Sequence, residues 1–261
     1  MYNLVKMHIT LKEKLDSLKG HIGFYYKDID SGFTYGYKQN DLFEAASVIK
    51  FPILCAVYKI AYENRTDLGE YIKVKDSDKF PGCGTLKLYD DEPEVNIATL
   101  CRLMISVSDN SATNILIRKY GIDKLNEEFR SIGLLNSHIE RFLFDAQSSK
   151  QGKENRVEPE EIGLLLERIY KGEFINEDIS DEIMNILLSQ QINHKVSILK
   201  QHDIKVAHKT GEDNGISNDV GIVLSDKPYV FCYLGNNTDT VEFEDFIRKS
   251  SYDLYSNSII F

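Results

Sequence analysis

The chain has 261 residues, of which 42% are hydrophobic and 28% are charged, and its formal net charge is −10 at pH 7. This length and composition are ordinary for a soluble globular protein with one large domain or two interleaved ones. The excess of negative charge repels nucleic acid and anionic membranes, so neither is expected as a partner. We expect a monomer.

The beginning of the chain has no apolar run followed by small residues, so no secretory leader is expected there. No segment is apolar for long enough to span a bilayer. The sequence therefore predicts a cytoplasmic protein, unless a leader has been removed, and it leaves both locations open.

The first predicted element is an amphipathic helix over residues 9–19, which Gly20 closes. Two aromatic-rich strands follow, at 22–26 and 33–37. They flank the turn residues Asp30-Ser31-Gly32, so we expect a hairpin.

The middle of the chain is predicted to be mainly helical, because apolar residues recur there at helical spacing. The expected helices cover residues 51–62, 97–107, 111–119, 122–131, 159–170 and 180–190. Two stretches without this periodicity, 76–96 and 144–158, are expected to be loops.

Strands return after about residue 203, and a final helix is predicted over 241–257. The three strands are expected at 206–210, 220–224 and 229–234. Strands at the two ends of the chain can pair only if the chain leaves a sheet and later returns to it. We therefore predict an α+β fold in which an antiparallel sheet carries the terminal helices.

This order of elements also predicts two interleaved domains. Residues 1–44 and 200–261 would form the sheet domain, and 45–199 the inserted helical domain. A site would then lie in the cleft between them.

Ser47-Val48-Ile49-Lys50 places a serine and a lysine one helical turn apart, so the two side chains share a face. A serine hydroxyl needs a base before it can act as a nucleophile, and a lysine can be that base when burial or a nearby cation keeps it neutral. In isolation the same residues would be an ordinary helix cap and a solvated lysine. Pro52 removes one helical hydrogen bond and is expected to bend the first turns.

Ser108-Asp109-Asn110 lies at a break between two helical stretches. Ser108 can relay a proton to a leaving group, and Asn110 can donate its amide to a substrate carbonyl or to Lys50. Asp109 is expected to point inward and bind backbone N–H groups. The alternative is a plain helix cap.

Lys209-Thr210-Gly211 lies on a predicted strand. Lys209 offers a charge and Thr210 a hydroxyl to a substrate carboxylate, and Gly211 would let a ligand approach closely. The backbone N–H of Glu212, together with that of Ser47, could form an oxyanion hole. The alternative is an edge strand that ends in a turn.

With these three motifs in this order, the chain resembles the class A β-lactamases and their serine-hydrolase relatives among penicillin-binding proteins. The resemblance covers about residues 20–250. It implies a five-stranded sheet next to a helical domain and acylation of Ser47 by a β-lactam, without a cofactor or metal. Lys50, Ser108, Asn110 and Lys209 would keep the roles given above.

One departure from the family concerns release of the acyl group. The family has a glutamate that activates the deacylating water, and this chain has Leu143 in its place. Asp145 and Glu154 are nearby substitutes, although neither has the family spacing, and a loop carboxylate is by default a solvated surface charge. We expect slow deacylation unless Asp145 acts as the base.

A second departure concerns substrate anions. Glu212 and Asp213 follow the Lys209 motif and would repel a carboxylate unless they point away, and no arginine follows on the next strand. Cys83 occupies the cleft rim, where the family often has an aromatic residue. These acids mildly favour the alternative of a peptidase or esterase for D-amino-acyl or other small acyl substrates, and the missing glutamate motivates a non-catalytic β-lactam-binding module.

The four cysteines match no zinc pattern. Cys55 and Cys101 follow and precede two of the motifs, so a disulfide between neighbouring helices is one alternative. The other is a set of buried, reduced thiols.

Overall fold

The structure is a computed structural model that describes residues 11–258. Its centre is an antiparallel five-stranded sheet with the strand order β2-β1-β9-β8-β7. The strands are β1 (His21–Asp28), β2 (Thr34–Tyr37), β7 (Lys205–Asp213), β8 (Ile216–Leu224) and β9 (Tyr229–Asn236). The predicted sheet is therefore confirmed, and it is built from both ends of the chain.

The two ends of the chain meet where β1 pairs with β9 over its full length, with Phe24 opposite Tyr233 and Asp28 opposite Tyr229. Residues of β1 alternate between the two faces of the sheet, as a strand requires. Phe24 packs in the core on the outer face, and Tyr25 packs in the core beneath the helices.

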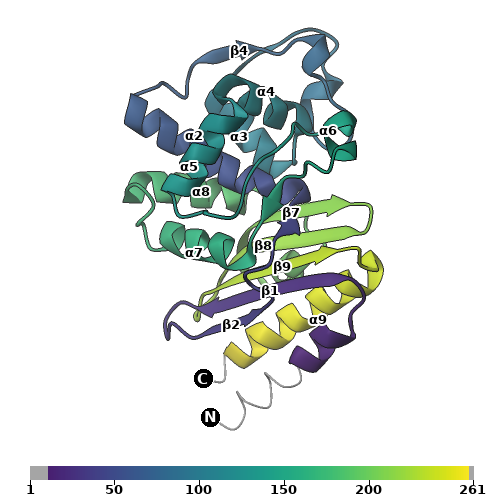
Figure 1. Cartoon of the computed structure of the whole chain (residues 1–261). Helices are drawn as coiled ribbons and strands as arrows, with labels where there is room; N and C mark the ends of the chain where they lie inside the picture. The colour runs from purple at the N-terminus through teal and green to yellow at the C-terminus, as the bar shows by residue number, and fades with distance from the viewer. Residues whose placement is uncertain (1–10, 259–261) are drawn as a thin grey trace.

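The outer face of the sheet is covered by α9 (Thr240–Ser258) and by the helical residues 11–17 (Figure 1). Aromatic and aliphatic side chains from the strands, including Phe231, fill this layer together with Phe243 and Ile247 of α9. The predicted final helix is confirmed. Residues 9 and 10 of the predicted first helix lie outside the described residues.

The inner face of the sheet carries the remaining helices, with α7 and α8 next to the strands and α2 to α5 further away (Figure 1). The bounds are α2 (Lys50–Asn64), α3 (Ile97–Ser106), α4 (Asn110–Tyr120), α5 (Ile122–Ser131), α7 (Pro159–Tyr170) and α8 (Glu177–Leu188). Each predicted helix is present, and α5 and α7 have the predicted bounds. Where the chain divides into domains, at 44/45 and 199/200, stays a prediction.

The two predicted loops contain short elements that hydrophobic periodicity did not reveal. β4 (Tyr71–Lys73) pairs with β5 (Glu94–Asn96), at the end of the first loop. In the second loop, α6 (Ala146–Lys150) is followed by β6 (Arg156–Val157), which pairs with β3 (Phe43–Glu44). Strands of two or three residues are too short to give a pattern of alternation.

The β3–β6 pair lies directly before Ser47 and connects the chain there to the second loop. Beyond the pair itself, the N–H of Ala45 donates to the carbonyl of Asn155. This contact positions residues 141–158 next to Ser47. Among the residues that the structure describes, no helix is long and apolar enough to cross a membrane.

Candidate active site

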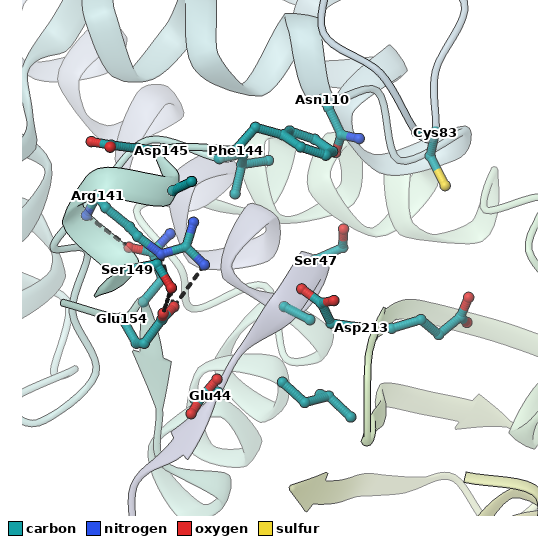
Figure 2. Close-up of a pocket in the computed structure, with 17 residues that line it drawn as sticks. Glu44, Ser47, Cys83, Asn110, Arg141, Phe144, Asp145, Ser149, Glu154 and Asp213 are labelled. Atoms are coloured by element: carbon teal, nitrogen blue, oxygen red, sulfur yellow. Dashed lines mark hydrogen bonds and ion pairs between the residues drawn. The ribbon is translucent and has the colours of Figure 1, made fainter. Parts of the chain in front are cut away.

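Ser47 and Asn110, from the first two motifs, line a cavity of about 400 Å³, together with Glu212, which directly follows the third motif (Figure 2). Ser47 is in the 3₁₀ turn η1 (Ala46–Ile49), Ser108 lies between α3 and α4, and Lys209 is on β7. The lining includes Ser47, Asn110 and Glu212, together with the loop residues 141 and 143–146. Residues far apart in sequence thus share one site.

The turn that carries Ser47 is a 3₁₀ helix, and the α-helix begins only at Lys50. Pro52 is therefore the third residue of α2, and η1 runs directly into this helix. The bend expected at Pro52 stays a prediction.

Lys50 is completely buried. Its Nζ lies 2.8 Å from the backbone oxygen of Ser108, 2.9 Å from Ser108 Oγ and 2.7 Å from Asn110 Oδ1. Burial, and secondly the nearby charge of Lys209, hold the pKa of Lys50 well below its usual value. The site therefore favours a neutral amine at this position.

Asn110 contacts Lys50 through its oxygen and not through its amide. The Nδ2 group instead donates to the carbonyl of Pro81 at 3.0 Å. The expectation that Asn110 donates to Lys50 is wrong, because its oxygen accepts from Lys50 and its amide N–H is bound by Pro81.

Ser108 has a backbone φ of +54°, in the left-handed region that non-glycine residues seldom adopt. This conformation places its hydroxyl between the two lysines, 2.9 Å from Lys50 Nζ and 3.2 Å from Lys209 Nζ. Strained backbone of this kind persists only when its surroundings hold it.

Asp109 holds the turn next to Ser108. Its carboxylate accepts hydrogen bonds from the backbone N–H groups of Ala112 at the start of α4, and from Thr85 and Leu86 across the loop. The expectation that Asp109 points inward and binds backbone N–H groups is confirmed. The aspartate thus fixes the position of Ser108 without facing the cavity itself.

Lys209 is also completely buried, and its Nζ donates to the carbonyl of Thr210 at 2.8 Å. Burial lowers the pKa of Lys209 to about 7, although the carboxylates of Asp219 and Glu212 act in the opposite direction. The charge of Lys209 is therefore sensitive to pH near neutrality.

Gly211 lies against the backbone of the turn that holds Ser47. A Cβ at this position would be 2.8 Å from the carbonyl oxygen of Ala45 and 3.1 Å from the backbone nitrogen of Ser47. The absent side chain therefore makes room for the protein's own backbone, whereas the sequence suggested room for a ligand. This contact brings β7 directly beside the backbone N–H of Ser47.

The loop carboxylates near the cavity bind other residues of the loop. Glu154 forms an ion pair with Arg141, at 2.6 and 2.8 Å, and accepts a hydrogen bond from Ser149. Asp145 caps α6 by accepting from the backbone N–H and the hydroxyl of Ser148, and these hydrogen bonds lower the pKa of Asp145. In Figure 2 the Asp145 carboxylate points away from Ser47.

Leu143 lines the cavity, and both of its backbone polar groups are bound by Asn114 of α4. Its N–H donates to Asn114 Oδ1 at 2.9 Å, and its carbonyl accepts from Nδ2 at 3.0 Å. The role of Asn114 as an anchor for the loop follows from the structure, because the two residues are 29 positions apart.

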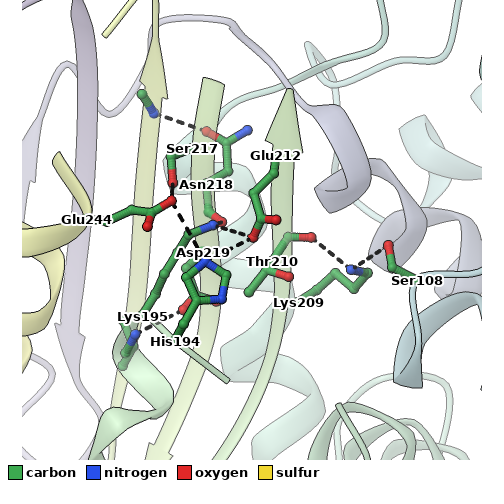
Figure 3. Close-up of polar contacts among 12 residues, drawn as sticks. Ser108, His194, Lys195, Lys209, Thr210, Glu212, Ser217, Asn218, Asp219 and Glu244 are labelled. Carbon is green, nitrogen blue, oxygen red and sulfur yellow. Dashed lines mark hydrogen bonds and ion pairs between the residues drawn. The ribbon is translucent and has the colours of Figure 1, made fainter. Parts of the chain in front are cut away.

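A second polar cluster lies beside β7 and was missed in the sequence (Figure 3). Lys195 is completely buried, and its Nζ donates to Glu212 Oε1 at 2.8 Å and to the carbonyl of Asn218 at 3.1 Å. Glu212 is therefore paired with a cation, which removes part of the predicted repulsion. Asp213 lines the cavity and has no ion pair within residues 11–258.

The four cysteines are free thiols, so the alternative of a Cys55–Cys101 disulfide is wrong. Cys55, Cys101 and Cys232 are buried, and burial raises the pKa of each thiol. Cys83 is exposed at the cavity, so the expectation of buried thiols fails there. No group of three or more metal-ligating side chains occurs within the described part of the chain.

The fold is shared with β-lactamases and penicillin-binding proteins of known structure. The structure of PBP-A has a TM-score of 0.89 at 26% identity, and the match covers 99% of this chain and 97% of PBP-A. A β-lactamase from Sphaerobacter thermophilus has a TM-score of 0.88 at 24% identity, with 97% of both chains covered.

Comparison of sequences also relates this chain to β-lactamases. The model of the beta-lactamase enzyme family matches residues 8–257, and this chain belongs to that family. The imipenem-hydrolysing β-lactamase of Enterobacter cloacae is 25% identical over 82% of this chain and 75% of its own length. The β-lactamase ROB-1 of Haemophilus influenzae is 24% identical over 90% of this chain and 79% of its own length.

Proposed function

We propose that this chain is a serine hydrolase that opens β-lactam rings through an acyl-enzyme on Ser47. The observation that carries the proposal is the chain of contacts from Lys50 through Ser108 to Lys209, with Ser47, three residues before Lys50, at the cavity. Such a chain can move a proton away from a nucleophile and towards a leaving group.

The first step is attack by Ser47 Oγ on the carbonyl carbon of the ring, while Lys50 takes the hydroxyl proton. A neutral amine has two N–H groups and one lone pair. The two N–H groups match the carbonyl oxygens of Ser108 and Asn110, which leaves the lone pair as a base. The backbone N–H groups of Ser47 and Glu212 would stabilise the oxyanion.

The second step is cleavage of the ring C–N bond as the tetrahedral intermediate collapses. Ser108 gives its hydroxyl proton to the departing nitrogen, and Lys50 returns a proton to Ser108 Oγ, 2.9 Å away. Lys209 and Thr210 would bind the substrate carboxylate throughout. The products are the opened ring, bound as an ester to Ser47, and a neutral Lys50.

Release of this ester requires an activated water, and here we propose that hydrolysis is slow. Leu143 has no proton acceptor, and the carboxylates of Asp145 and Glu154 are bound within their loop. Asp145 could serve as the base only after giving up its hydrogen bonds to Ser148. Loss of general-base catalysis costs about 10²–10⁴-fold in rate.

The test is a time course of intact mass after adding penicillin G or a cephalosporin to the purified protein. We expect an adduct that forms quickly and persists, and no adduct on Ser47→Ala. Rapid return to the free mass would mean efficient hydrolysis. A protein that neither forms an adduct nor turns over the drug would contradict the proposal and leave a non-catalytic binding module.

A second candidate is a D-amino-acyl peptidase or esterase of the penicillin-binding type, and two observations favour it. Asp213 lines the cavity, and its carboxylate has no ion pair among the residues that the structure describes. PBP-A resembles this chain over nearly its whole length, and a leucine-to-glutamate variant of PBP-A has been solved as an acyl-enzyme with penicillin G. Turnover of D-Ala-D-Ala peptides or small esters faster than of β-lactams would support this candidate.

A further inference from the structure

Lys195 is a buried cation beside the strand that carries Lys209. Its side chain is 0% exposed, and it lies just before the 3₁₀ segment η4 (Val196–His202), which packs against β7. A buried ammonium group is costly unless an anion is close by. The net charge beside β7 therefore depends on whether an anion pairs with Lys195.

The anion that pairs with Lys195 is the carboxylate of Glu212. Oε1 accepts from Lys195 Nζ at 2.8 Å and lies 3.3 Å from His194 Nε2 (Figure 3). Unlike Lys195, Glu212 is 42% exposed and also lines the cavity. One end of this ion pair is thus fixed in the protein, and the other faces the space where a ligand would bind.

Thr210 and Glu212 are two positions apart on β7, so their side chains lie on the same face of the strand. Lys195 therefore lies on the face that also presents the Thr210 hydroxyl. Both Glu212 and Lys195 act on the pKa of Lys209, the carboxylate raising it and the ammonium lowering it. The pair is close enough to influence a carboxylate bound at Lys209 and Thr210.

We propose that Glu212 is a specificity-determining residue that neutralises Lys195 and thereby weakens binding of substrates with a free carboxylate. The proposal rests on the function proposed above. The protein itself supplies an anion where a second cation would otherwise attract the substrate carboxylate. Binding of substrates whose carboxylate is esterified or absent is not weakened in this way.

The experiment compares penicillin G with its methyl ester, which differ only in the charge of the carboxylate. The second-order rate of acylation of Ser47 is measured for both by intact mass, and the acid-to-ester ratio is taken. In Glu212→Gln we expect this ratio to rise by about three- to tenfold, and less in high salt. The glutamine keeps the backbone N–H and an oxygen for Lys195. Without the carboxylate the pKa of Lys209 should fall, so part of the Lys209 charge is lost. This partial loss is smaller than the full negative charge that the substitution removes.

Lys195→Met provides the opposite test, because it leaves Glu212 without its cation. In this variant the acid-to-ester ratio should fall, and thermal unfolding will establish that the protein is folded. The matched control is Glu244→Gln. Glu244 accepts a hydrogen bond from Ser217 and lies 3.7 Å from His194, but it does not line the cavity. Its removal should change the ratio by less than about twofold.

The outcomes separate this inference from the function on which it rests. An unchanged or lower ratio in Glu212→Gln, with Ser47 still acylated, overturns the inference alone. An equal rise in Glu244→Gln also overturns it, because the effect would then come from net charge. Absence of acylation of the wild-type protein by either compound overturns both.

Discussion

The two walls of the cavity differ in what their polar groups bind. On the side of the cavity that Ser47, Asn110 and Glu212 line, Ser108 is buried and contacts the two buried lysines, Lys50 and Lys209. On the wall formed by residues 141–158, Arg141 pairs with Glu154 and Asp145 caps α6. The polar groups on the first side are close enough for proton transfer among them, whereas those on the second side stabilise the conformation of the loop.

Under the proposed function, formation and hydrolysis of the acyl-enzyme therefore depend on separate parts of the molecule. A family fold can keep the first while the second changes, because within residues 11–258 no hydrogen bond of Lys50, Ser108 or Lys209 reaches the loop. One contact between the two sides runs through Asn114 and the backbone of Leu143, and another joins the backbone of Ala45 to that of Asn155.

The largest effect is expected for Lys50→Met. The substitution removes the base but keeps most of the buried volume, so acylation of Ser47 should slow by about 10³–10⁴-fold. Stopped-flow or intact-mass kinetics with penicillin G will measure it. The fold must remain intact by circular dichroism, and a loss below tenfold would mean that another group takes the proton of Ser47.

The next largest effect concerns Leu143→Glu, which places a carboxylate on the loop wall. Because Asn114 fixes the backbone there, the new side chain should face the cavity and activate a water, so deacylation should accelerate by about 10²–10³-fold. The lifetime of the acyl-enzyme measures this change. The control is Leu88→Glu, at a side chain that is 71% exposed and outside the cavity. An equal lifetime in both variants would contradict the separation of the two walls.

A smaller effect is expected for Gly211→Ala. Its Cβ would collide with the backbone around Ser47, so β7 and η1 must move apart. We expect about tenfold slower acylation and about 1–3 kcal/mol lower stability in denaturant unfolding. The control is Gly69→Ala, where a Cβ meets only the Asp67 side chain. Equal acylation by Gly211→Ala and wild type would show that the close contact is not needed.

The smallest effect is a dependence on pH. Lys209, with a pKa of about 7, carries its charge below this pH and loses it above. As the pH rises from about 6 to 8, the acid-to-ester ratio of penicillin G acylation should therefore fall by about three- to tenfold. Taking the ratio cancels pH effects on Lys50, which act on both compounds. A ratio that rises with pH would contradict the assignment of Lys209 as the anion-binding group.

Much of the fold and the convergence of the motifs could be predicted from the sequence. The aromatic strands at both ends and the periodic helices between them define the sheet and the inserted helices. The spacing of Ser47 and Lys50 requires only local geometry. Their meeting with Ser108 and Lys209 followed from the resemblance to a known family, because no local pattern relates residues that are 101 positions apart.

What could not be predicted depends on long-range contacts between short segments. Asn114 binds Leu143, and Lys195 pairs with Glu212, and neither pair has a signal in spacing or composition. A buried lysine and a solvated one look alike in sequence, since only the fold decides how much water surrounds each. The direction of the Asn110 side chain likewise became clear only when its partners were known.

The pairing of β1 with β9 also has a consequence for the order in which the molecule assembles. Because β1 pairs with β9, residues 21–28 cannot join the sheet in full until residues 229–236 have left the ribosome. Lys209 is made later than Ser47 and Ser108. Contacts of such long sequence separation slow folding. We therefore expect the nascent protein to become reactive towards acylating compounds only after β9 has emerged.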